Sequence, residues 1–141
     1  MLGADDGRQA VRLVRERARE LGIKEDHLGM MGFSAGGYVT MAAVMGPAEG
    51  RPDFAAPVYA AAGKKYQLPV VVPDNAPPLC IMTAADDQLI PWERSMEIFK
   101  AWRDAGYPAE IHIFQSGKHG FVEKGGGADP VSYTHLTLPT N

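Results

Sequence analysis

The sequence has little of several features that would each indicate a particular class of protein. It has one cysteine, Cys80, in an apolar run that predicts a buried strand, so no disulfide can form within the chain. No apolar run approaches the roughly 18 residues of a membrane-spanning helix. The net charge of −3 leaves no excess of the basic residues that nucleic-acid binding requires. We therefore expect neither a membrane nor a nucleic-acid partner.

The composition is that of an ordinary globular domain, while the location of the protein stays open. Hydrophobic residues make up 45% and charged residues 22% of the 141 residues, which is typical of one folded domain. The first residues contain no apolar segment of the kind found in signal peptides. Because we expect the true N-terminus to be missing (see below), we assign neither export nor retention.

The order of periodic patterns predicts an α/β fold with a mainly parallel sheet. Val11, Val14, Ala18 and Leu21 recur at helical spacing and would share one buried helix face. Short apolar runs alternate with helical patterns, which favours parallel strands covered by helices. We expect helices over residues 6–21, 35–45 and 92–105, strands over 27–33, 54–62, 79–84 and 109–114, and loops over 63–78 and 115–121.

The strongest chemical signal is Gly32-Phe33-Ser34-Ala35-Gly36, a G-x-S-x-G motif between an expected strand and an expected helix. There the serine sits on a sharp, strained turn, and we expect side chains at both glycine positions to collide. The turn presents the Ser34 hydroxyl at a helix start, where backbone N–H groups and the helix dipole favour negative charge. Ser34 is therefore the candidate nucleophile, and the N–H of Ala35 a candidate oxyanion-hole donor.

A serine hydroxyl needs a base to remove its proton, and His119 is the best candidate. It follows an expected strand, in a loop whose glycines let the chain bend toward the serine. His27 precedes the first strand and His112 lies inside a strand, so both fit less well. The third group required is a carboxylate that orients the imidazole. Asp86 and Asp87 directly follow an expected strand, and spacing does not distinguish them.

Five segments carry a resemblance to a known family: Gly-Phe-Ser-Ala-Gly-Gly, Ala-Pro-Pro-Leu-Cys-Ile, Asp-Asp-Gln-Leu-Ile-Pro, Pro-Ala-Glu-Ile-His-Ile-Phe and Gly-Lys-His-Gly-Phe. With them, residues 5–125 resemble the acetyl-xylan-type and related carbohydrate esterases of the α/β-hydrolase superfamily. The resemblance implies a partial α/β-hydrolase fold in which about four strands are retained and flanked by helices. It also implies hydrolysis of acetyl or other short-chain esters of a small molecule or carbohydrate, without metal or organic cofactor.

The resemblance also assigns the acid and shows two departures from the family pattern. In that family the triad acid is the aspartate four residues before a proline, which here is Asp87 before Pro91. Lys118 stands where the family usually has glycine. The family's His-Gly-Gly-type loop, which supplies a second oxyanion donor, does not occur before Ser34.

The missing loop indicates that this chain holds only part of the domain. Residues 1–130 are expected to be the C-terminal catalytic part of a single α/β-hydrolase domain, without its N-terminal strands and last helix. Residues 131–141 resemble the translation of a sequencing-library adapter, so we treat them as not native, and His135 with them.

Two other functions stay open at this point. A serine peptidase of the prolyl-oligopeptidase type shares the fold, but Ala35 after the nucleophile and the histidine loop favour an esterase. A non-catalytic α/β-hydrolase-fold binding protein would tolerate loss of a triad member, yet all three candidates are present.

Overall fold

The computed structural model describes residues 2–63, 66 and 68–122. In chain order it has α1 (Leu2–Glu16), α2 (Ala18–Leu21), β1 (Gly29–Phe33), α3 (Ala35–Val44), the 3₁₀ helix η1 (Ala48–Gly50), β2 (Phe54–Val58), β3 (Leu79–Ala84), α4 (Glu93–Asp104) and β4 (Ala109–Phe114). Each expected helix and strand is present. Residues 131–141, the expected non-native tail, lie outside the described residues. Among the described helices none is long and apolar enough to cross a membrane.

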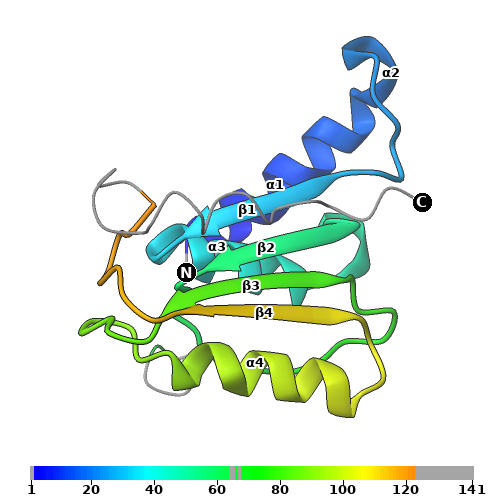
Figure 1. Ribbon diagram of the computed structural model, residues 1–141. Coiled ribbons are helices and arrows are strands. Elements are labelled where there is room, and N and C mark those ends of the chain that lie inside the picture. Colours follow the sequence, from blue (N-terminus) through cyan, green and yellow to red (C-terminus); the bar gives the residue numbers. More distant parts are fainter. Residues whose placement is uncertain (1, 64–65, 67, 123–141) are drawn as a thin grey trace.

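The four strands form one sheet in the order β1-β2-β3-β4, and each neighbouring pair is parallel. The register places Met31 of β1 opposite Ala56 of β2, and Cys80 of β3 opposite Glu110 of β4. Because parallel strands all end at the same edge, the segments that follow β1, β3 and β4 start from one side of the molecule (Figure 1). The expected α/β fold with a parallel sheet and flanking helices is confirmed.

Helices α3 and α4 pack against one face of the sheet. Their apolar side chains join those of the central strands in one core, in which Met41, Ile98 and Trp102 are fully buried. The indole N–H of Trp102 donates to the carbonyl oxygen of Pro77 at 2.9 Å, so the polar group of this buried side chain is paired. Helix α1 lies against α3 on the same side of the sheet, behind β1 in the view of Figure 1.

The N-terminal helix departs from its expected pattern. Val11 and Ala18 are buried as expected, but Val14 is 38% and Leu21 50% exposed. The helix runs outward past the sheet and is interrupted after Glu16, so its last turns have no core beneath them (Figure 1). The expectation that all four residues share a buried face is therefore wrong for Val14 and Leu21.

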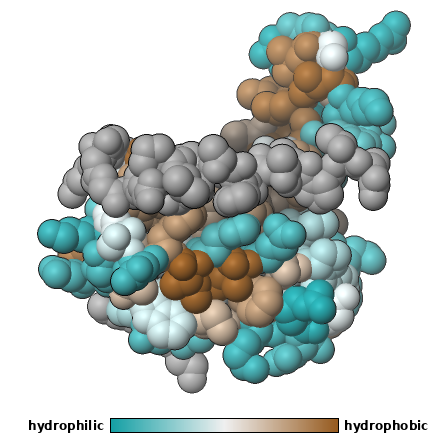
Figure 2. All heavy atoms as spheres, in the orientation of Figure 1, coloured by the Kyte–Doolittle hydropathy of each residue, from teal (hydrophilic) through white to brown (hydrophobic). Residues whose placement is uncertain are grey.

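The opposite face of the sheet carries a smaller apolar cluster. Val58, Tyr59, Met82 and Phe121 are buried in it, and Cys80 packs at its margin. Cys80 lies in β3 as expected but is half-buried rather than buried. No described helix packs on this face, and Figure 2 shows apolar side chains gathered over its middle, with hydrophilic ones beside them.

Candidate active site

The backbone turns sharply at Ser34, between the end of β1 and the start of α3. Ser34 has φ 54° and ψ −113°, a conformation that costs a non-glycine residue free energy. Its N–H donates to the carbonyl oxygen of Val58 on β2 at 3.0 Å, and its own carbonyl oxygen accepts from Tyr38 at 3.0 Å. These bonds hold the strained turn, so the serine side chain stands at the edge where the strands end.

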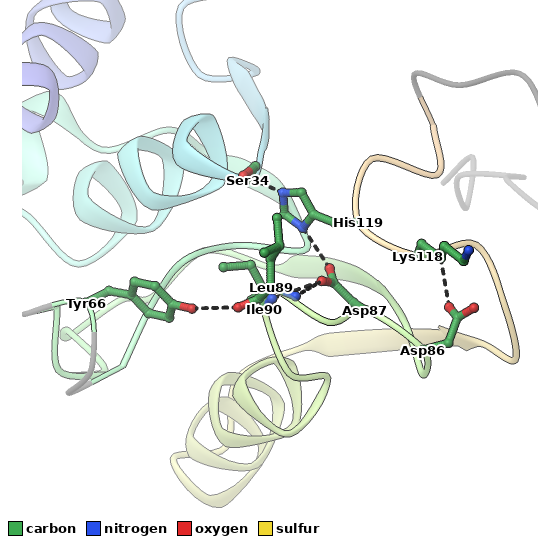
Figure 3. A network of polar contacts seen from close by, with 8 residues as sticks. All are labelled: Ser34, Tyr66, Asp86, Asp87, Leu89, Ile90, Lys118 and His119. Carbon is green, nitrogen blue, oxygen red and sulfur yellow. Dashed lines mark hydrogen bonds and ion pairs between the residues drawn. The ribbon is translucent and has the colours of Figure 1, made fainter.

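Three side chains from three segments meet at this edge. Ser34 Oγ lies 2.8 Å from His119 Nε2, and His119 Nδ1 lies 2.9 Å from Asp87 Oδ2 (Figure 3). The Asp87 side chain is fully buried, whereas the His119 side chain is 22% exposed. A carboxylate can only accept, so Nδ1 carries the proton of a neutral imidazole and Nε2 is left to accept from the Ser34 hydroxyl. The three residues singled out in the sequence are therefore in hydrogen-bond contact, in the order needed to activate a serine.

Most of the chain matches a known protein family. The dienelactone hydrolase family matches residues 4–135 of the chain. The chain belongs to the dienelactone hydrolase family. A curated relative of this family member is the acetylxylan esterase of Xylanibacter ruminicola, which is 32% identical over 145 residues. That alignment covers 82% of this chain and 30% of the relative.

Solved structures of α/β-hydrolases resemble this dienelactone hydrolase family chain. MGS-M1, an α/β-hydrolase enzyme from a Medee basin deep-sea metagenome library, superimposes with a TM-score of 0.74 at 27% identity, over 83% of this chain and 50% of that chain. The acetyl ester-xyloside bifunctional hydrolase from Caldicellulosiruptor lactoaceticus gives 0.72 at 27% identity, over 83% and 56%. The resemblance inferred from the sequence is confirmed. The chain spans about a third of the curated relative and about half of these structures.

The two glycines of the motif differ in whether the structure leaves room for a side chain. A Cβ on Gly32 would lie 2.2 Å from the carbonyl oxygen of Gly36 and 2.4 Å from Thr40 Oγ1. A Cβ on Gly36 would meet nothing within 4 Å, so the expected collision at that position is wrong. The second tight position is Gly37, whose Cβ would lie 2.8 Å from the Cα of Ala60. Gly32 and Gly37 therefore let α3 approach the end of β1 and the segment after β2.

This difference predicts unequal effects of two alanine substitutions. Gly32→Ala forces the backbone of the turn apart and is expected to destabilise the chain by about 3 kcal/mol or more. Gly36→Ala meets open space in a helix, where alanine is favoured over glycine, and is expected to change stability by less than about 1 kcal/mol. Urea unfolding followed by circular dichroism measures both. Equal destabilisation by the two variants would contradict this description of the turn.

The two adjacent aspartates have separate roles in the geometry. Asp87 Oδ1 accepts from the backbone N–H groups of Leu89 and Ile90 at 2.8 and 2.9 Å, which fixes the carboxylate while Oδ2 faces His119 (Figure 3). Asp86 instead accepts from the backbone N–H of Lys118 at 2.8 Å. Asp87 thus contacts the imidazole directly, and Asp86 ties the histidine loop to the loop after β3.

Lys118 stands where the family usually has glycine, and its backbone conformation shows why glycine suits this position. Lys118 has φ 58°, in the left-handed region where glycine is least strained, which accounts for the glycine usual at this position. The hydrogen bond from the Lys118 N–H lowers the pKa of Asp86 below its usual value. At a pH above the ordinary pKa of an aspartate, the bond therefore stabilises the loop in full. This stabilisation is lost as the pH falls through the lowered pKa of Asp86.

Tyr59 is a site residue that the sequence analysis did not find. Strand β2 ends at Val58, four residues earlier than expected, because Tyr59 takes φ 35° and turns the chain. The buried Tyr59 ring meets the His119 imidazole edge-on, with centroids 4.9 Å apart, and Phe121 at 5.2 Å. It supports one side of the imidazole. No signal in the sequence indicated this role, because Tyr59 lay inside the strand expected over residues 54–62.

The other candidate histidines lie apart from this site. His27 is largely exposed and pairs with Asp26, with Nδ1 and Oδ1 2.7 Å apart. His112 lies in β4 as expected, beside Glu110. Ala35 is exposed and begins α3, so its N–H is one of the helix's first four and has no partner within the helix.

Proposed function

We propose that this chain carries the catalytic site of a serine carboxylic ester hydrolase, with Ser34 as nucleophile, His119 as base and Asp87 as the acid that orients it. The observation that carries the proposal is the continuous contact from Ser34 Oγ through His119 to Asp87, at 2.8 and 2.9 Å. The strained Ser34 backbone at a helix start supports it further. No other described histidine contacts a serine hydroxyl.

The first half of the reaction forms an acyl-enzyme. Ser34 Oγ attacks the ester carbonyl carbon while its proton moves to His119 Nε2. The carbonyl oxygen becomes an oxyanion and accepts a hydrogen bond from the Ala35 N–H, strengthened by the positive end of the α3 dipole. When the tetrahedral adduct collapses, the carbon–oxygen bond to the alcohol breaks. The alcohol leaves with the proton from His119, and the acyl group stays on Ser34.

The second half returns the enzyme to its starting state. His119 Nε2 removes a proton from a water molecule, which attacks the acyl carbon. The adduct collapses, the free acid leaves, and Ser34 Oγ recovers the proton from His119. Asp87 accepts from Nδ1 throughout and stabilises the imidazolium present in both halves.

The substrate class is proposed from the relatives. One relative is named an acetylxylan esterase and a structural relative an acetyl ester-xyloside hydrolase, both at 27% identity or more. We therefore favour acetyl or other short-chain esters, carried by a small molecule or a carbohydrate. The half-buried serine and the 22% exposed imidazole leave the site accessible from solvent.

A substrate panel tests this proposal. The chain, and any longer protein that contains it, would be given p-nitrophenyl acetate, p-nitrophenyl octanoate, acetylated xylan and a prolyl p-nitroanilide. We expect the acetate to be hydrolysed fastest, acetic acid to be released from xylan, and the anilide to remain intact. Faster cleavage of the anilide than of the acetate would favour a peptidase. A folded protein that cleaves none of them would favour a binding protein.

A further inference from the structure

Three potential metal ligands lie together on the sheet face that no described helix covers. Cys80 is the second residue of β3 and pairs in register with Glu110, the second residue of β4. His112 follows two residues after Glu110, so its side chain points to the same face. A cross-strand pair plus an i, i+2 neighbour forms a triangle of side chains on adjacent strands. The triangle lies near the start of the strands, away from the Ser34 edge.

The distances are close to those of a metal site. One ligand atom from each of the three residues lies within 4.8 Å of the other two. His112 Nε2 is 3.8 Å from Glu110 Oε2. Bonds of about 2.0 to 2.3 Å to a tetrahedral ion require the three atoms to be roughly 3.5 Å apart. The His112 and Glu110 side chains are 42% and 71% exposed and can rotate by the small amount needed.

We propose that Cys80, Glu110 and His112 bind a divalent transition-metal ion of the zinc type. A thiolate and an imidazole are ligands that zinc favours, whereas magnesium and calcium prefer oxygen ligands alone. The thiolate and the carboxylate together carry two negative charges, which a divalent ion neutralises. Three protein ligands complete a tetrahedral site with one water molecule.

Binding at this place would join the last two strands of the sheet. β4 is the end strand in the sheet order and pairs only with β3 among the described strands. Asp87 follows β3 and His119 follows β4, so the ion would tie together the two strands that lead to these residues. We expect the ion to raise thermal stability while remaining outside the reaction itself.

The chemistry of the thiol provides a further consequence. Burial, and to a smaller extent the charge of Glu110, raises the pKa of the Cys80 thiol. Among the described strands, Glu110 and His112 of β4 lie beside the thiol, and β2 carries apolar residues. A zinc-type ion binds cysteine as the thiolate, so binding releases the thiol proton.

A titration of the metal-free chain with Co²⁺, followed by displacement with Zn²⁺, tests the proposal. We expect saturation at one equivalent, a thiolate-to-cobalt absorption band, tetrahedral visible bands, and a higher melting temperature with Zn²⁺. Cys80→Ser is expected to remove the thiolate band, and Glu110→Gln and His112→Gln to weaken binding by at least about tenfold. Glu110→Gln changes an exposed side chain and keeps the test valid if Cys80→Ser does not fold.

The matched control is His27→Gln, which removes an exposed histidine that is also paired with a carboxylate. It is expected to leave the affinity unchanged. Absence of the thiolate band in the folded wild-type chain would overturn the proposal. Equal loss of affinity in His27→Gln and His112→Gln would overturn it as well, because the binding would then be nonspecific.

Discussion

Replacing Ser34 with alanine is expected to lower kcat for p-nitrophenyl acetate by about 10⁶-fold, to the residual rate given by binding and oxyanion stabilisation. The reason is that Ser34 Oγ is the atom that forms the acyl-enzyme, and His119 Nε2, 2.8 Å away, has no other described hydroxyl to activate. The variant removes one oxygen atom from a half-buried position, so the fold should persist. Steady-state kinetics with circular dichroism of both proteins measure the effect.

The control for this variant is Ser116→Ala, which makes the same change at an exposed serine of the histidine loop. It is expected to retain the wild-type rate within a few-fold. If Ser34→Ala keeps most of the activity while folded, another group is the nucleophile and the proposed mechanism is wrong. If Ser116→Ala is as inactive as Ser34→Ala, loss of activity on removal of a serine hydroxyl does not identify the nucleophile, and the assignment to Ser34 loses its support.

Asp87→Asn is expected to lower kcat by about 10⁴-fold with little change in stability. The asparagine oxygen can still accept from Leu89 and Ile90, so the turn is retained. The amide NH₂ then faces His119 Nδ1 and favours the tautomer with the proton on Nε2. In that tautomer Nε2 donates to Ser34 and cannot remove its proton. The pH dependence and kcat of the purified variant measure the loss.

The neighbouring Asp86→Asn gives a matched comparison one residue away. Asp86 contacts the Lys118 N–H and not the imidazole, and an asparagine oxygen can still accept there. We expect kcat to fall by less than about tenfold. The loop contact should also become insensitive to acid, because the carboxylate with the lowered pKa is gone. A larger loss in Asp86→Asn than in Asp87→Asn would reverse the assignment of the acid.

Local patterns were sufficient to predict the element types and to place Ser34, His119 and the Asp86–Asp87 pair at one edge of the sheet. Strand-like runs before Ser34, Asp87 and His119 placed all three after parallel strands, and parallel strands end at one edge. Spacing could not separate Asp86 from Asp87, because both occupy the same loop. The choice depends on which carboxylate faces the imidazole, which is a property of the three-dimensional turn.

Other features depend on contacts between segments distant in the sequence. Gly36 looks equivalent to Gly32 in the motif, but of the three glycines at this turn it is Gly32 and Gly37 at which an added Cβ would collide with other atoms. The early end of β2 follows from the backbone turn at Tyr59, which an apolar run continuing to residue 62 did not indicate. Likewise, the pairing of Cys80 with Glu110 depends on the strand register, which no sequence pattern specifies.

The most direct test of the account is whether Ser34 is an activated nucleophile in this chain. The wild-type chain and the variants His119→Gln and Ser34→Ala would be incubated with a fluorophosphonate probe, and the labelled peptides mapped by mass spectrometry. The account predicts one labelled site, Ser34, in the wild-type chain, with much slower labelling in His119→Gln and none in Ser34→Ala. Equal labelling of wild type and His119→Gln, or a folded wild-type chain that takes up no probe, would contradict it.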